Sequence, residues 1–190
     1  MAKLYFTYGT MGSSKTAQAL MLRFSFIEKG QKVLFLKPSI DTRDGNNIVR
    51  SRIGLEAEVL TYDKEENILD KFNFDLIDLD CIIIDEVHFS TKDHIEQLKY
   101  IAEYFNIPVF TFGLRSDFKT ELFEGSKRLF ELADTISEIK NPCHCGSKTI
   151  VNARYKGKKI VYDGKKIILG GNDQYKSLCY RCYKEGRLEK

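Results

Sequence analysis

The sequence has no long apolar run, little net charge, and no repeat or low-complexity segment. Its longest apolar stretches, such as Cys81 to Ile84, are far too short to cross a bilayer. The first residues, Met1 to Lys3, lead directly into a strand-like segment and do not form a secretion signal. We therefore expect no membrane association and a cytoplasmic location.

The five cysteines do not suggest a disulfide framework. Cys81 lies in an apolar strand pattern and is expected in the core. The other four form two close pairs far apart in the sequence, Cys143 with Cys145 and Cys179 with Cys182. Because the chain shows no secretory signal, this arrangement favours zinc over disulfides.

Length and composition favour one main domain with a small appended module. A chain of 190 residues with 43% hydrophobic residues can bury one good core. The net charge is only +3, but the segment from Arg154 onward contains 11 of the 30 Lys and Arg and only 4 of the 27 Asp and Glu. Such a basic tail fits nucleic-acid binding, and it fits equally a solvated face or one that meets an acidic neighbour or a phosphate.

Strand-like and helix-like patterns alternate along the first 140 residues. Strands are predicted at Leu4 to Tyr8, Val33 to Lys37, Cys81 to Asp85 and Val109 to Phe112. Helices are predicted at Thr16 to Glu28, His94 to Phe105 and Glu121 to Ala133, and a mobile surface loop at Asp41 to Asn47. The alternation predicts an α/β fold, with a parallel sheet and helices on both faces.

A loop of small residues joins the first predicted strand to the first predicted helix. It reads Gly9-Thr10-Met11-Gly12-Ser13-Ser14-Lys15-Thr16. Backbone N–H groups in such a loop can surround a triphosphate at the helix N-terminus. In the P-loop pattern Lys15 reaches the outer phosphates and the Thr16 hydroxyl binds Mg²⁺. The segment predicts ATP binding in a P-loop NTPase-like fold, with an ordinary Gly/Ser turn as the alternative.

One position departs from that pattern, because Ser14 stands where a second Gly usually precedes the Lys. A positive φ would cost Ser about 1 kcal/mol or more, whereas a helical conformation would cost nothing. Since Ser14 lies at the helix start, we expect its backbone to be helical.

The strand from Cys81 to Asp85 is followed by a second acid, Glu86. Asp85 is expected beside the P-loop, where it would supply a carboxylate near the metal. Glu86 turns to a different face at the carboxyl edge of the sheet, where a general base could reach an acceptor hydroxyl. A solvated acidic turn is the alternative.

From the P-loop to the last Cys pair, the sequence resembles the zinc-containing type II thymidine kinases. Asp85-Glu86-Val87-His88-Phe89 is similar to that family's acidic strand end, in which the glutamate, here Glu86, is the base toward the nucleoside 5′-hydroxyl. Asp41-Thr42-Arg43 resembles its Asp-x-Arg segment, with Arg43 suited to stabilising phosphoryl charge. The resemblance thus implies catalytic roles for Glu86, Arg43 and Lys15.

The base pocket is implied by a third segment, Gly113-Leu114-Arg115-Ser116-Asp117-Phe118, which resembles the family's Gly-Leu-Arg-x-Asp-Phe. From the residues alone, core positions are the favoured interpretation of Leu114, Phe118 and the following Phe123. The resemblance favours a nucleoside pocket instead, because a flat pyrimidine needs aromatic and aliphatic walls. The implied wall residues are Met11, Phe89, Leu114, Phe118 and Phe123.

Beyond Pro142 the pattern changes to a zinc-ribbon layout, with short strands predicted at Thr149 to Tyr155, Lys159 to Tyr162 and Lys165 to Leu169. The two Cys pairs can provide four thiolates to one Zn²⁺, with His144 as an alternative ligand. A site with all four positions filled would be structural. Between the pairs, the run from Ile168 to Tyr175 resembles the family's lasso, a loop over the nucleoside, with a plain hairpin turn as the alternative. The implied lasso contacts are Ile168, Leu169, Gly170, Gly171, Asn172 and Tyr175.

We therefore predict a P-loop kinase domain at residues 1–140 and a zinc-ribbon lid with a lasso at 141–190. The resemblance implies transfer of the γ-phosphoryl of ATP, with Mg²⁺, to deoxythymidine or deoxyuridine, giving dTMP for DNA synthesis. It also implies a homotetramer, inhibition by dTTP, and no nucleic-acid partner. The rival interpretation is a P-loop ATPase whose basic zinc ribbon grips DNA or RNA. A non-enzymatic zinc-ribbon module would leave Lys15, Asp85 and Glu86 without a purpose.

Overall fold

A computed structural model of the chain describes residues 1–76, 78–166 and 174–189. Within this part, six parallel strands form the main sheet in the order β5-β2-β6-β7-β1-β8. Their bounds are β1 Leu4–Gly9, β2 Val33–Pro38, β5 Leu60–Tyr62, β6 Cys81–Ile84, β7 Val109–Gly113 and β8 Thr135–Ile139. The predicted parallel α/β sheet is confirmed.

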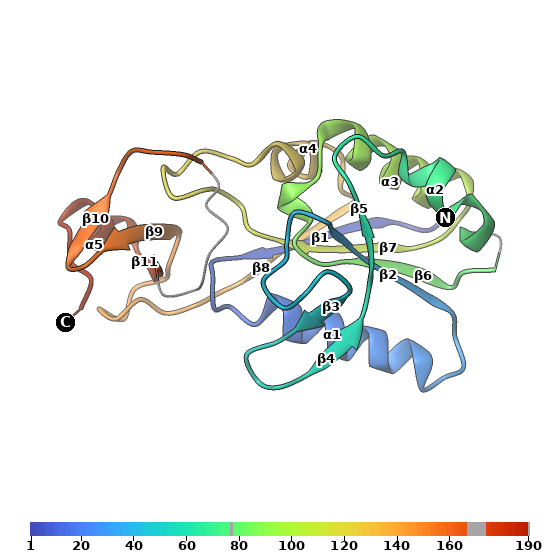
Figure 1. Ribbon diagram of the computed structural model, residues 1–190, viewed down its shortest axis with the longest axis horizontal. Coiled ribbons are helices and arrows are strands. Elements are labelled where there is room, and N and C mark those ends of the chain that lie inside the picture. The colour runs from blue at the N-terminus through green and yellow to red at the C-terminus, as the bar shows by residue number, and fades with distance from the viewer. Residues whose placement is uncertain (77, 167–173, 190) are drawn as a thin grey trace.

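Helices cover both faces of this sheet (Figure 1). Helix α1 (Lys15–Ile27) lies on one face, and α2 (Ile68–Leu76), α3 (Lys92–Tyr104) and α4 (Glu124–Leu132) lie on the other. Strand β6 alternates between two cores, since successive side chains of a strand point to opposite faces. Ile82 and Ile84 pack in the cluster that includes residues of α3, whereas Cys81 and Ile83 pack in the cluster that includes residues of α1. The predicted core position of Cys81 is confirmed.

The strands β3 (Ile48–Arg50) and β4 (Glu56–Glu58) form an antiparallel hairpin after the predicted surface loop. A buried lysine of β2 anchors this region. The Nζ of Lys37 donates to the carbonyl oxygens of Gly45 and Ile48, both at 2.8 Å, and lies 3.7 Å from Asp41 Oδ2. The loop from 41 to 47 is thus tied to the sheet at these points. Most of its residues are exposed, as predicted for a surface loop, and its mobility stays a prediction.

A second sheet follows residue 140, antiparallel and in the order β10-β9-β11. Its elements are β9 Val151–Lys156, β10 Lys159–Val161, β11 Tyr175–Leu178 and the short helix α5 Tyr180–Lys184. This module lies at the end of the molecule opposite the N-terminus (Figure 1). The third strand is β11, whereas the predicted strand at Lys165 to Leu169 is not formed at 165–166 and otherwise lies outside the described residues. No helix in the described ranges is long and apolar enough to span a membrane.

Candidate functional site

The loop between β1 and α1 has the close packing that a P-loop requires. A Cβ on Gly9 would clash with Ser13 and come within 2.8 Å of the Ile139 carbonyl oxygen, so only Gly fits. Gly12 has a φ of +75°, which Gly adopts without strain. The Nζ of Lys15 turns into the loop and donates to the Thr10 carbonyl at 2.8 Å. Burial lowers the pKa of Lys15 to about 8, against the opposing charges of the nearby carboxylates.

The prediction of a helical backbone at Ser14 is wrong. Ser14 has φ 65° and ψ 22°, the left-handed conformation, and helix α1 begins only at Lys15. The position therefore keeps the conformation for which P-loops generally use Gly, although a side chain is present. Such a conformation costs an L-residue about 1–2 kcal/mol.

Because of this strain, Ser14→Gly is expected to stabilise the protein by about 1 kcal/mol, after allowing for the greater freedom of Gly in the unfolded chain. It should change the KM for ATP by less than about tenfold, since the loop already has the conformation that Gly prefers. Urea unfolding and initial rates would measure both effects. Ser14→Ala is the matched control, because it removes the hydroxyl but keeps the Cβ. An equal gain in both variants would contradict the strain at this position.

Asp85 follows β6 and lies beside the start of α1. Its Oδ1 is buried and has no hydrogen-bond partner among the described residues. Burial, and then the charge of Glu86, raise the pKa of Asp85 to about 7, while a hydrogen bond with Thr16 acts in the opposite direction. A buried carboxylate oxygen without a partner, next to a Thr hydroxyl, offers hard oxygen ligands of the kind Mg²⁺ prefers.

Glu86 takes a left-handed backbone conformation, with φ 53°, directly before the 3-10 turn Val87–Phe89. Arg43 bridges two acids there: Nη2 donates to Glu86 Oε1, and Nε donates to Asp41 Oδ1 at 2.6 Å. Burial opposes ionisation of Glu86, but the Arg43 guanidinium outweighs it and holds the pKa of Glu86 below its usual range. Arg43 and Glu86, each predicted separately as a catalytic residue, are therefore brought together as an ion pair.

His88 stands directly behind this pair and was not singled out from the sequence. Its Nδ1 accepts from the Leu114 N–H at 3.2 Å and lies 3.5 Å from Glu86 Oε2. Because Nδ1 accepts, the proton is assigned to Nε2, which is buried and has no partner in the described part of the chain. Burial lowers the pKa of His88 to about 3, so the imidazole is neutral. The ring packs on Phe89 and Phe123, with centroids 4.1 and 4.6 Å apart.

These side chains surround a cavity of about 710 Å³. Most of the residues predicted for ATP and nucleoside line it: Met11, Gly12, Ser14, Lys15, Thr16, Arg43, Asp85, Glu86, Phe89, Leu114, Phe118, Phe123 and Tyr175. Gly9, Thr10 and Ser13 support the loop without being among the lining residues. The predicted contacts Ile168, Leu169, Gly170, Gly171 and Asn172 lie outside the described residues. Phe118 and Phe123 are buried and also line the cavity, so their role as walls of a nucleoside pocket stays a prediction.

The zinc-ribbon module holds the P-loop directly. Asn152 of β9 accepts from the Met11 N–H at 2.8 Å and donates to the Ser116 carbonyl at 3.1 Å, and it lines the cavity. Ser177 of β11 donates to the Met11 carbonyl. Sequence reasoning missed Asn152 because a polar residue in a short strand carries no signal of its partners.

The turn of the β3–β4 hairpin also borders the cavity, a position that was not predicted from the sequence. The Nη1 of Arg52 lies 3.6 Å from the place where a Cβ on Gly12 would be. This arginine therefore adds positive charge near the phosphate loop. The sequence around it carries no motif that links Arg52 to the phosphate loop, so sequence analysis did not place it there.

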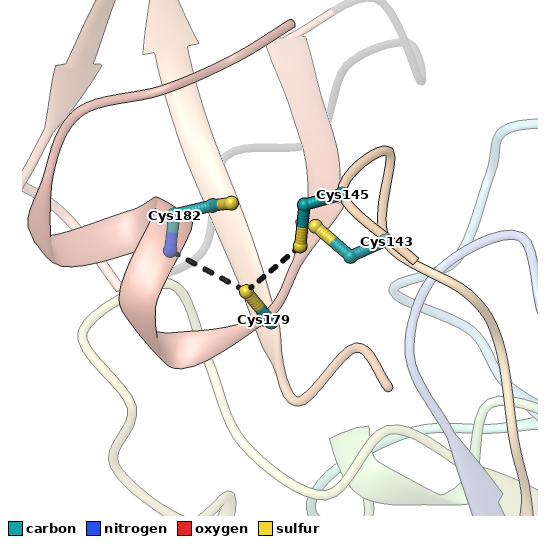
Figure 2. Close-up of side chains that lie close together, drawn as sticks. All are labelled: Cys143, Cys145, Cys179 and Cys182. Carbon is teal, nitrogen blue, oxygen red and sulfur yellow. Dashed lines mark hydrogen bonds between the residues drawn. The ribbon is translucent and has the colours of Figure 1, made fainter. Parts of the chain in front are cut away.

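The four paired cysteines converge, as Figure 2 shows. All four Sγ atoms lie within 4.8 Å of one another, and Cys145 Sγ is 3.6 Å from Cys179 Sγ. Sulfurs at about 2.3 Å from a tetrahedral Zn²⁺ would be separated by roughly 3.8 Å. The donor set and spacing therefore fit zinc. His144 lies next to the cluster, with Nε2 3.5 Å from Cys182 Sγ.

Comparisons with known proteins find relatives that match nearly the whole chain. A family model described as thymidine kinase matches residues 2–183. A thymidine kinase of Lactococcus lactis is 41% identical over 184 residues, covering 96% of this chain and 97% of that protein. One of Zymomonas mobilis is 40% identical over 188 residues, with 97% of both covered. The alignment with a crystal structure of Bacteroides Pif1 bound to ssDNA has 16% identity and a TM-score of 0.44, and it covers 72% of this chain and 38% of that one.

Proposed function

The chain belongs to the thymidine kinase family of ATP-dependent phosphotransferases, and from that premise we propose that it transfers the γ-phosphoryl of ATP to the 5′-hydroxyl of deoxythymidine. The product is dTMP, made by salvage for DNA synthesis. One observation carries the proposal. A single cavity contains the phosphate loop, the Arg43–Glu86 pair and aromatic walls of the kind that a pyrimidine needs.

In this proposal the P-loop backbone from Gly9 to Thr16 surrounds the ATP phosphates, and Lys15 donates to the outer ones. Asp85 and Thr16 would hold Mg²⁺, which supplies charge neutralisation at the phosphates. The unpartnered Asp85 Oδ1 supports this assignment. Each group thus acts by positioning and by stabilising charge, which is how proteins accelerate phosphoryl transfer.

In the same proposal, Arg43 acts on the transferring phosphoryl group and Glu86 acts on the nucleoside 5′-hydroxyl. In the structure Arg43 neutralises Glu86. When Arg43 donates instead to the transferring phosphoryl group, Glu86 loses a positive neighbour and becomes a stronger base. It can then orient the 5′-hydroxyl and accept its proton late in the reaction.

The nucleoside is proposed to lie between Met11, Phe89, Leu114, Phe118 and Phe123, next to Tyr175. Contacts from the lasso, Ile168 to Asn172, stay a prediction. Thymine presents an N3–H donor between two carbonyl acceptors, a pattern that backbone groups of the lasso can complement. Cytosine presents an acceptor and an amino donor at the same edge, so it would leave buried polar groups unpaired.

The test is kcat/KM for different nucleosides with ATP and Mg²⁺. Two mismatched polar groups at about 1–3 kcal/mol each should reject deoxycytidine by roughly 10² or more. Deoxyuridine lacks only the methyl group and should remain a substrate. ATP should be consumed only when a nucleoside is present, and nucleic acid should not stimulate its hydrolysis. Comparable values for deoxythymidine and deoxycytidine, or ATPase activity driven by DNA or RNA, would reject this assignment.

We also propose that Cys143, Cys145, Cys179 and Cys182 hold a structural Zn²⁺. Purified protein should contain about one zinc per chain by metal analysis. Cys182→Ser should lose it and destabilise the module by several kcal/mol, because metal binding and local folding are coupled. Cys81→Ala, which removes a cysteine outside the cluster, should keep its zinc, and so should His144→Ala if all four ligands are thiolates. Active protein without zinc would contradict the proposal.

Further elements of the proposal are inhibition by dTTP, a homotetramer, a cytoplasmic location and a boundary near residue 140 between kinase domain and zinc ribbon. The continuous cavity supports the first, since dTTP could place its base among the walls and its phosphates on the P-loop. Exposed apolar side chains on α1 support self-association: Met21, Phe24 and Ile27 are 50%, 63% and 43% exposed.

A further inference from the structure

Arg154 of β9 is buried, with 4% of its surface exposed, yet it has no acidic partner among the described residues. Buried guanidinium groups usually pair with a carboxylate, since burial of an unpaired charge is costly. Here neutral oxygens take that place. Nη1 donates to the Lys165 carbonyl at 2.8 Å and Nη2 to the Lys166 carbonyl at 3.3 Å.

The same guanidinium organises two walls of the cavity. It lies 3.7 Å over the ring of Phe118. Its Nε and Nη2 both donate to the hydroxyl oxygen of Tyr175, at 3.0 and 2.7 Å. Phe118, Tyr175 and Lys166 line the cavity, whereas Arg154 is not among the lining residues. Arg154 therefore acts on the cavity through its neighbours.

The two bonds from Arg154 determine what the Tyr175 hydroxyl can do. A phenol oxygen that accepts two N–H groups has its own proton left to donate, and that proton points away from the arginine. Within the described ranges, the Tyr175 O–H meets no acceptor. Hydrogen bonds from a charged donor also polarise the phenol, which makes it a stronger donor. Tyr175 thus presents a polarised O–H group at a wall of the cavity.

We propose that Arg154 fixes Tyr175 as a hydrogen-bond donor to an oxygen atom of the bound nucleoside, with the Phe118 ring held beside it. The inference rests on the proposed function, because the nucleoside is the occupant of this part of the cavity. Deoxythymidine offers suitable acceptors in its two pyrimidine carbonyls and its 3′-hydroxyl. Tyr175 is then a binding residue, and Arg154 is a positioning residue that acts through it.

The experiment compares Tyr175→Phe, Arg154→Met and the double variant with the wild-type enzyme. Tyr175→Phe keeps the aromatic wall and removes only the hydroxyl. We expect the KM for deoxythymidine to rise about tenfold or more in each single variant, while the KM for ATP and the kcat at saturating nucleoside stay within about threefold. The double variant should be no worse than the poorer single variant, because both lose the same interaction. Arg181→Met, at an exposed arginine of α5, is the matched control and should change nothing.

An unchanged nucleoside KM in Tyr175→Phe, or effects of the two changes that multiply, would overturn the proposal. Arg154→Lys keeps the charge without the planar fork and should behave like Arg154→Met. If Arg154→Met does not fold, Arg154→Lys and Tyr175→Phe still test the proposal. With 2′,3′-dideoxythymidine, loss of the Tyr175→Phe penalty would assign the acceptor to the sugar, and persistence would assign it to the base. If the wild-type enzyme phosphorylates no nucleoside at all, the proposed function itself fails, which is a different result.

Discussion

Lys15→Ala is expected to lower kcat/KM for phosphorylation of deoxythymidine by about 10³-fold or more, the size of effect seen when a cation at a transferring phosphoryl group is lost. The Nζ of Lys15 lies inside the phosphate loop, bonded to the Thr10 carbonyl. Arg43 and Arg52 also border the cavity. Neither is placed within the loop, so neither can take over the Lys15 contacts.

Steady-state rates at varied ATP would measure the loss, with Lys29→Ala as the control. Lys29 is an exposed lysine just beyond the end of the same helix, so its removal changes the net charge equally without touching the cavity. Urea unfolding of both variants would show that Lys15→Ala is folded. A Lys15→Ala protein that still phosphorylates deoxythymidine efficiently would remove the P-loop from the mechanism.

Glu86→Gln should lower kcat by roughly 10²–10⁴, because Gln keeps the shape of the side chain but cannot accept the hydroxyl proton. The base acts late in a loose phosphoryl-transfer transition state, so a larger loss is not expected. Gln also leaves Arg43 without its charged partner at this position, although Asp41 still holds its Nε. The KM for ATP should therefore change little.

The measurement is kcat at saturating deoxythymidine and ATP, together with direct ATP binding. Glu185→Gln, at an exposed glutamate just after α5, controls for the lost charge and should have wild-type turnover. Near-normal turnover of Glu86→Gln with intact ATP binding would show that Glu86 is not the base.

The central part of the fold could be predicted from sequence because it depends on local periodicity. Four of the six parallel strands were placed to within a residue or so of their observed ends. The strands β5 and β8 were not recognised. Both lie at the sheet edges, where one flank has no neighbour and the apolar pattern is weaker. Helix α2 was also missed.

The site could be predicted where a short motif carries its own chemistry. The P-loop and the acids after β6 lie at the carboxyl ends of β1 and β6, two parallel strands with only β7 between them, so the topology brings them to the same edge of the sheet. The backbone of Ser14 was predicted wrongly because its place at the helix start was given more weight than the Gly that the P-loop pattern usually has there, and α1 begins only at Lys15. His88, Asn152 and Arg154 act through partners distant in the chain, and a single sequence does not show such pairs.

The burial of Lys37 reduces the amount of backbone that has to become ordered when substrates bind. Ordering one residue of backbone costs about 1–2 kcal/mol of conformational entropy. By holding the carbonyls of Gly45 and Ile48, Lys37 places the segment that carries Arg43 when the chain folds and not when a ligand arrives. Substrate binding then has less disorder to remove, so more of the contact energy at Arg43 remains for the role in phosphoryl transfer proposed for it.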